Sequence, residues 1–228
     1  MGQKKKLCLY EELMLLALRD EKGTVSGAYI EQAIAGAILA QLLLERRISI
    51  ADTRRVLVDV DDSSPTGDAI LDMCLQTMAQ SSRRASLRNW VSRLARAKQL
   101  RHQVARKLCE RGILRADEGK VLFVFTRKIY PEINPQPERE ILDRLYQAIY
   151  AEKEVVSPRT SVIISLAKST GLLAQAFGAG EIRRRRKRIK QIEEGQLAGK
   201  ATREVIAACQ AAVMVAAVMP AVMVTSHH

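Results

Sequence analysis

The sequence predicts a mainly α-helical protein, a single helical domain over residues 1–228 with small β-hairpins on one face. Apolar residues recur at helical intervals through most of the chain, and the two β-rich runs are short and each follow a helical segment. With 228 residues, 47% of them hydrophobic and 27% charged, the chain can bury a core without disulfide or metal cross-links. We expect residues 7–224 to be ordered and residues 225–228 to form a tail.

The N-terminal part contains two predicted helices. Leu9, Leu13 and Leu16 keep helical spacing, and the charged run before Gly23 ends this first helix. Residues 30–44 are apolar on nearly every side, which is typical of a helix surrounded by other helices. We therefore expect the second helix to be central.

A helix-plus-hairpin pattern occurs twice, once from Leu43 and again from Leu108. Each copy has a helix end, then an Ala-Asp pair and then a β-rich apolar run, at the same internal spacing. A helix that stops before a polar turn and an extended run predicts a hairpin in each copy. Two copies are too few for a solenoid.

An acidic, turn-rich loop over residues 59–68 precedes the next predicted helix. Its four aspartates lack the DxDxDG order and the closing glutamate of a calcium loop. An aspartate just before a helix has a structural role as its cap. The four cysteines are scattered along the sequence and form no CxxC pair, so their spacing does not indicate a zinc site. We therefore predict no metal site and no cofactor.

Positive charge is concentrated in two segments of a chain whose net charge is +12. Residues 83–115 hold eleven cations and one anion, and residues 183–190 hold seven cations in eight positions. Such an excess predicts a polyanionic partner, either anionic lipid or nucleic acid. Aromatic residues make up only 4% of the chain, which argues against stacking on single-stranded nucleic acid. For residues 183–190, a solvated helix face is the alternative interpretation.

The C-terminal half is predicted to be helical again. Prolines mark a connector over residues 131–137, and two helices are expected around residues 141–149 and 162–176. Residues 205–224 are apolar and long enough to span a bilayer, but seven of them are alanine, which contributes little to insertion. A buried core helix is the preferred interpretation of this segment, and a membrane span is the alternative.

Six segments, in order along the chain, resemble the Golgi phosphoprotein 3 (GPP34) family. They are LYEELMLLALRDEKG (9–23), LLLERRISI (42–50), SPTGDAILD (64–72), RNWVSRLA (88–95), QLRHQVARKLCERGIL (99–114) and SVIISLAKSTGLLAQAF (161–177). The resemblance implies a mostly helical peripheral membrane protein that binds phosphatidylinositol 4-phosphate on the cytosolic side of a membrane. It also implies the cytosolic tails of membrane proteins as partners.

The resemblance places the family's headgroup pocket on particular positions. Two pocket arginines, on the helix before the second hairpin, match Lys98 and Arg101. The third pocket arginine matches Ala35, and the pocket tryptophan matches the region of Ala28 and Tyr29. Because these positions differ from the family's pocket, we predict an anionic phospholipid membrane as the partner and leave the exact lipid open.

The spacing of three basic residues supports the same site independently. Lys98, Arg101 and His102 lie at positions i, i+3 and i+4, so on one helix they project from one face and can converge on a phosphate. Arg101 can bind two oxygens with its planar fork, whereas Lys98 supplies a mobile point charge. With Tyr29, these are the predicted headgroup-binding residues. The alternative is an amphipathic helix with a solvated basic face.

The second hairpin carries the predicted membrane-inserting residues. Val121–Phe125 does not alternate polar and apolar residues, so a strand there has an apolar face. We expect this tip to enter the headgroup layer, as the resemblance implies, and a fully buried strand is the alternative. The predicted inserting residues are Leu122, Phe123, Val124 and Phe125, with Lys120, Arg127 and Lys128 as electrostatic support.

Sequence motifs of common enzymes are absent. The chain contains no GxGxxG, GxxxxGK[ST], HExxH or GxSxG pattern. His102 lies in a basic segment with no carboxylate nearby in sequence, which disfavours a general base. We therefore predict no enzymatic activity and no catalytic residues.

A winged-helix-like DNA-binding protein is the alternative function, because an arginine-rich helix before a hairpin also fits that class. The apolar hairpin and the six segments favour lipid over nucleic acid. Glu11 and Glu12 interrupt the apolar stretch after the basic N-terminus, which argues against a secretory signal. We predict a cytoplasmic protein, peripheral on the cytosolic face of a membrane, and leave its oligomeric state open.

Overall fold

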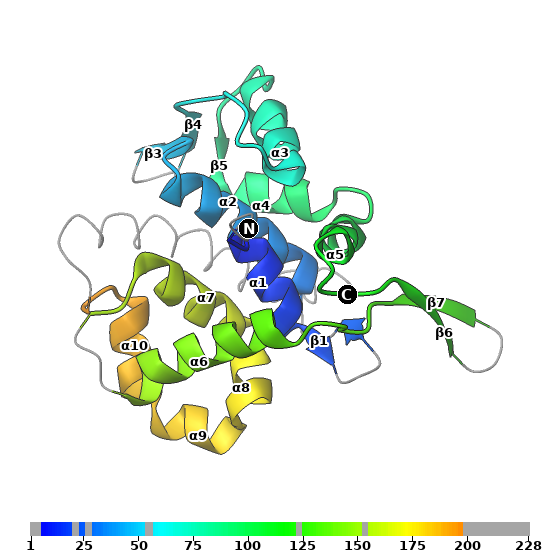
Figure 1. The fold of residues 1–228 in the computed structure, drawn as a ribbon. Helices are drawn as coiled ribbons and strands as arrows, with labels where there is room; N and C mark the ends of the chain where they lie inside the picture. The colour runs from blue at the N-terminus through cyan, green and yellow to red at the C-terminus, as the bar shows by residue number, and fades with distance from the viewer. Residues whose placement is uncertain are drawn as a thin grey trace, which may run out of the picture.

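The computed structural model describes residues 6–19, 23–25, 29–52, 57–121, 125–151 and 155–197. Helices and three small antiparallel sheets make up these residues, which confirms the mainly α prediction (Figure 1). The helices are α1 (Leu9–Leu16), α2 (Ile30–Leu44), α3 (Ala69–Ala79), α4 (Leu87–Ala95), α5 (Leu100–Glu110), α6 (Gln136–Tyr150), α7 (Pro158–Ser169), α8 (Leu172–Phe177), α9 (Ala179–Arg184) and α10 (Arg186–Glu193). The strands are β1 (Leu18–Arg19), β2 (Thr24–Val25), β3 (Ile48–Asp52), β4 (Leu57–Val60), β5 (Ala85–Ser86), β6 (Asp117–Val121) and β7 (Phe125–Ile129).

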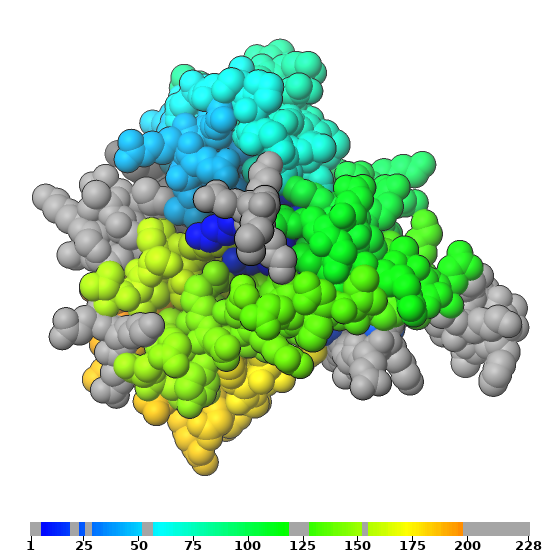
Figure 2. Space-filling view, in the orientation of Figure 1, coloured from blue at the N-terminus to red at the C-terminus, as the bar shows by residue number. Residues whose placement is uncertain are grey.

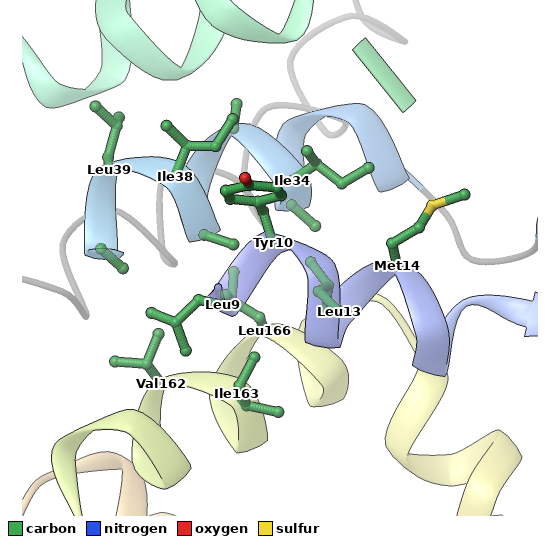
Figure 3. Packing of buried hydrophobic residues seen from close by; sticks show 14 of the residues in the cluster. Leu9, Tyr10, Leu13, Met14, Ile34, Ile38, Leu39, Val162, Ile163 and Leu166 are labelled. Carbon is green, nitrogen blue, oxygen red and sulfur yellow. The ribbon is translucent and has the colours of Figure 1, made fainter. Parts of the chain in front are cut away.

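Helix α2 lies at the centre of the core, as its apolar sequence predicts. It packs against α1, α4, α5 and α7, and Ile34, Ile38 and Leu39 are fully buried. Burying a side chain of this size stabilises the fold by about 1.5–3 kcal/mol. Figure 3 shows Tyr10 of α1 directed toward Ile34 and Ile38.

Helix α1 is enclosed on all sides. Every residue from Leu9 to Leu16 is buried, and these include Glu11 and Glu12. Figure 3 shows α1 between α2 and α7, whose Val162, Ile163 and Leu166 cover the side away from α2. Two buried carboxylates in such a helix require buried cations as partners.

Two helix-plus-hairpin units are present, as predicted. Strands β3 and β4 pair after α2, and β6 and β7 pair after α5, both antiparallel. Strand β5 adds a third strand to the first hairpin. The prediction of one strand from Val121 to Phe125 is wrong, because Val121 ends β6 and pairs with Phe125 at the start of β7. Val121 and Phe125 therefore lie on two different strands, as the last pair of the hairpin ladder.

The helix predicted over residues 162–176 is divided into α7 and α8. Gly171 lies between them with a φ of +78°, a left-handed conformation that glycine adopts without steric cost. The helical spacing of apolar residues continues through the sequence of both helices, whereas the chain changes direction between α7 and α8 (Figure 1).

The aspartates of the acidic loop have protein partners. Asp68 is the N-cap of α3, and its carboxylate accepts hydrogen bonds from the backbone N–H groups of Ile70 and Leu71. The other three interact in pairs: Asp59 with Arg84, Asp61 with Ser49, and Asp62 with Arg47. Helix capping, ion pairs and a hydrogen bond thus give each of the four aspartates a structural role.

Within the described ranges no helix is long and apolar enough to cross a bilayer. Residues 205–224, for which a core helix and a membrane span were both considered, lie outside these ranges, as do residues 225–228.

Candidate functional site

Buried ion pairs to α1 and α3 hold helix α5 in place. The guanidinium of Arg111 donates hydrogen bonds to both carboxylate oxygens of Glu11, at 3.1 and 2.9 Å. Lys107 forms an ion pair with Asp68 and donates a hydrogen bond to the hydroxyl of Tyr10 at 2.6 Å. Because Glu11 is fully buried, loss of its partner would leave an uncompensated charge in the core. These contacts determine which flanks of α5 face solvent.

The ionisable groups of this network have shifted pKa values. Burial acts to raise the pKa of Asp68, but hydrogen bonds from Lys107, Tyr10 and the backbone N–H of Leu71 lower it to about 2. Burial, together with the charge of Asp68, raises the pKa of the Cys8 thiol to about 12. Asp68 is therefore ionised and Cys8 protonated at neutral pH, so Cys8 lacks the thiolate character of a nucleophile.

Another flank of α5 carries Arg101 and His102. Nη1 of Arg101 lies 3.3 Å from Oε1 of Glu31 in the first turn of α2, and both side chains are 36% exposed. Nδ1 of His102 lies 2.8 Å from the hydroxyl of Tyr130, the residue after β7. A pair as exposed as Arg101–Glu31 contributes at most about 1 kcal/mol, so Arg101 can exchange this carboxylate for another anion.

Positive charge surrounds His102. Partial burial lowers the pKa of its imidazole, and the charges of Arg101 and Lys128 lower it further, against the opposing effect of Glu31. Arg106 acts in the same direction with a smaller effect. Cations from α5 and β7, which are separate in the sequence, thus gather around one histidine.

Lys98 does not lie on the same helix as Arg101, so the predicted single helical face is wrong at this position. Gln99 has a φ of +58°, in the left-handed region, and this residue separates α4 from α5. Lys98 lies in the turn between the two helices, with an exposed side chain. Its carbonyl accepts a hydrogen bond from Nε2 of Gln103 at 3.0 Å, which attaches the turn to α5.

Tyr29 begins the helix that carries Glu31, the partner of Arg101. It is the N-cap of α2, with a left-handed backbone and a side chain that is 47% exposed, two residues before Glu31. Ala35, which matches the third pocket arginine of the family, is fully buried within α2. Ala28 lies outside the described residues.

The β6–β7 hairpin stands away from the helices (Figure 1). Lys128 is exposed, and the 2.8 Å contact between His102 and Tyr130, the residue after β7, places the base of the hairpin beside α5. The remaining hairpin predictions fall outside what the structure describes: Leu122, Phe123 and Val124, and the side chains of Lys120, Phe125 and Arg127.

Sequence patterns did not single out Glu31, Tyr130 or Arg106 for this site. The only local signal was for Glu31, an acid in the first turn of an otherwise apolar helix. A groove of about 530 Å³ between α5 and the start of α3 was also not foreseen, and Gln103 and Arg106 are among its lining residues. Figure 2 shows α5 (green) at the surface, between α3 (cyan) and α6 (yellow-green).

The fold and the site define a class: mainly helical proteins with a cationic surface beside a projecting hairpin, and with no membrane-spanning helix among the residues described. A model of the Golgi phosphoprotein 3 (GPP34) family matches residues 9–209. The chain therefore belongs to the Golgi phosphoprotein 3 family, as its six sequence segments indicated.

One relative was found in Eremothecium gossypii. The chain is 29% identical to the vacuolar protein sorting-associated protein 74 of that organism, in a 199-position alignment that covers 76% of this chain. The match covers 59% of the relative, so the chain spans only part of that protein's length.

Proposed function

We propose that this chain is a peripheral membrane protein that binds anionic phospholipid headgroups, with phosphatidylinositol 4-phosphate as the proposed specific ligand. The observation that carries the proposal is the group of cations around His102, at the base of a hairpin that stands away from the helices. Membership of the Golgi phosphoprotein 3 family supports it. The proposed role is recognition, without a catalytic step.

Arg101 is the residue proposed to orient the headgroup. Its guanidinium can donate two parallel hydrogen bonds to phosphate oxygens in place of the weak contact with Glu31. His102 and Lys98 supply further donors nearby. Tyr29, half-exposed at the N-cap of the helix that carries Glu31, is proposed to cover one side of the headgroup.

The end of the hairpin is proposed to enter the headgroup layer. The pair formed by Val121 and Phe125 lies at the end of β6–β7 that is farthest from Asp117 and Ile129 at its base. Burying one Phe side chain contributes about 1.5–3 kcal/mol, and each cation near an anionic leaflet contributes about 1 kcal/mol. The sum of these terms supports a reversible attachment.

Replacing Arg101 with glutamine is expected to weaken binding to vesicles of phosphatidylinositol 4-phosphate and phosphatidylcholine by about 5- to 10-fold. Glu31→Gln is expected to strengthen binding, because it removes the carboxylate that competes for Arg101. Vesicle flotation measures both effects, with Arg88→Gln, an exposed cation on α4, as the matched control.

Equal effects of Arg101→Gln and Arg88→Gln would contradict the proposed orienting role. Duplex DNA, added as a competitor, tests the alternative function. If the chain is instead a winged-helix-like DNA-binding protein, the duplex would displace the vesicles, and Arg101 would be needed for binding to the duplex.

Lowering the pH from about 7 to 5 is expected to strengthen binding to phosphatidylglycerol vesicles. The pKa of His102 lies below its ordinary value of 6.5, so the imidazole is neutral at pH 7 and gains a proton as the pH falls below that ordinary value. A bound anion favours the charged imidazole, so binding takes up a proton and tightens as the pH falls. The phosphodiester of phosphatidylglycerol keeps its charge throughout.

His102→Gln is expected to flatten this pH profile. Because the folded pKa lies below the unfolded value, protonation of His102 also lowers the stability of the fold in the same window. Circular dichroism at each pH separates that effect from binding. An unchanged profile in His102→Gln would assign the dependence to other groups.

The name of the relative suggests a wider role. The Eremothecium gossypii protein is named for vacuolar protein sorting. By analogy, we include the cytosolic tails of membrane proteins among the proposed partners, on the cytosolic face of a membrane. Co-sedimentation of tail peptides with vesicle-bound protein tests this extension.

A further inference from the structure

A second cationic surface lies on α9 and α10. Figure 1 places these helices at the opposite end of α6 from the β6–β7 hairpin. Backbone hydrogen bonds of 3.0 Å, from Arg185 to Glu181 and from Ile189 to Arg185, continue the helical path from α9 into α10. Four exposed cations therefore share one face, at positions i, i+3, i+4 and i+7. They are Arg183, Arg186, Lys187 and Lys190.

The opposite face attaches these helices to the core. Ile189 and Ile192 are fully buried. Nε of Arg188 donates a hydrogen bond to the carbonyl of Ala148 at 3.1 Å, and the guanidinium of Arg185 lies 5.2 Å from the ring centre of Tyr150. These two arginines are thus used in packing, and the exposed cations are held on a fixed scaffold.

The nearby carboxylates already have partners, and one of these partners is Lys190 of this surface. Glu181 pairs with Arg184, Glu193 with Lys168 and Glu194 with Lys190. Across the described part of the chain, Arg183, Arg186 and Lys187 have no carboxylate at ion-pair distance. Within the described residues no carboxylate neutralises these three cations, and the phosphates of an anionic surface can do so.

Aromatic side chains adjoin this surface. Tyr146 is 49% exposed and stacks on Tyr150 with a distance of 4.6 Å between ring centres. Tyr150 in turn contacts Phe177, at 6.1 Å between ring centres. An exposed tyrosine, with an apolar ring and a polar hydroxyl, is typical of the boundary between lipid and water. A cationic stripe beside it fits a bilayer better than a duplex, whose phosphate backbone offers no apolar layer.

We propose that the α9–α10 surface is a second contact with anionic bilayers, separate from the site at α5. This inference rests on the proposed function, because the ligand is again a bilayer. Unlike the site at α5, the α9–α10 surface requires no selectivity for one headgroup. Helix α6, which has 15 residues and a length of about 22 Å, lies between the β6–β7 hairpin and the α9–α10 surface. One headgroup cannot bridge that distance, so the two surfaces bind different lipids.

The test is flotation of the full chain with vesicles of phosphatidylserine and phosphatidylcholine. The triple variant Arg183→Gln, Arg186→Gln and Lys187→Gln is expected to bind about 100-fold more weakly, because each cation near an anionic leaflet contributes a several-fold gain. Tyr146→Ser, which leaves the charge unchanged, is expected to weaken binding several-fold. A matched control removes three exposed cations elsewhere: Arg46→Gln, Arg83→Gln and Arg88→Gln.

The outcomes separate this surface from the α5 site. A loss in the α9–α10 triple that the control triple lacks supports the proposal, whether or not Arg101→Gln has an effect. Equal losses of vesicle binding in both triple variants would show that only the net charge matters, and this would overturn the proposal. An unaffected α9–α10 triple, with Arg101→Gln still impaired, would overturn this inference and leave the proposed function standing. Loss of duplex binding instead of vesicle binding would assign the surface to nucleic acid and also overturn it.

Discussion

Replacing Glu12 with glutamine is expected to lower the free energy of unfolding by about 3–5 kcal/mol. The Glu12 carboxylate is 2% exposed and accepts hydrogen bonds from Arg144 at 3.1 Å and from Arg159 at 2.9 and 3.0 Å. A neutral amide would leave both guanidinium groups partly buried without their counter-charge. These contacts join α1 to α6 and α7, so the whole helical core is affected. Urea denaturation followed by circular dichroism measures the change.

Glu110→Gln is the matched control for this prediction. Glu110 is exposed at the end of α5, so the same chemical change there is expected to alter stability by no more than about 0.5 kcal/mol. If Glu12→Gln lowers the free energy of unfolding as little as Glu110→Gln does, the buried ion pairs are not required for the fold.

Gly23→Ala is expected to destabilise the fold by about 3 kcal/mol or more. Gly23 has a φ of +63°, and a Cβ added there would overlap the backbone of Tyr130 and Pro131. Its carbonyl also accepts a hydrogen bond from the N–H of Tyr130 at 2.9 Å. Relief of the overlap would displace Tyr130 and with it the partner of His102. Thermal unfolding measures the stability, and an NMR titration of His102 reports the displacement.

Gly180→Ala provides the contrast. A Cβ at Gly180, within α9, meets no atom within 4 Å. Alanine is a better helix former than glycine, so this variant is expected to gain about 0.5–1 kcal/mol. A similar loss at both glycines would show that backbone overlap at Tyr130 is not the cause.

Local periodicity predicted much of the secondary structure. The segment 30–44 forms α2 with those bounds, because a helix buried on all sides needs apolar residues at every turn. The helix boundaries near Gln99 and Gly171 were not predicted. A single residue in the left-handed region ends a helix but leaves the apolar spacing on either side unchanged.

The candidate site followed from the sequence only in part. Arg101 and His102 were chosen from their spacing, and the structure gives each a partner from another element, Glu31 and Tyr130. Apart from the position of Glu31 in the first turn of an apolar helix, those partners had no local signal, because a contact between separate elements depends on how the elements pack. Lys98 remains a proposal, in a turn beside α5 instead of on its face.

The sequence by itself determined the helical class, the repeated helix-plus-hairpin pattern and the concentration of positive charge, since these depend on composition and residue order. Only the tertiary structure decided which cations stay available to a ligand. Lys107 and Arg111 are paired with buried carboxylates, whereas Arg101 and Arg106 lie on accessible flanks of the same helix. The physical reason is that Arg111 meets Glu11 across 100 residues of sequence, and helix packing sets such a pairing.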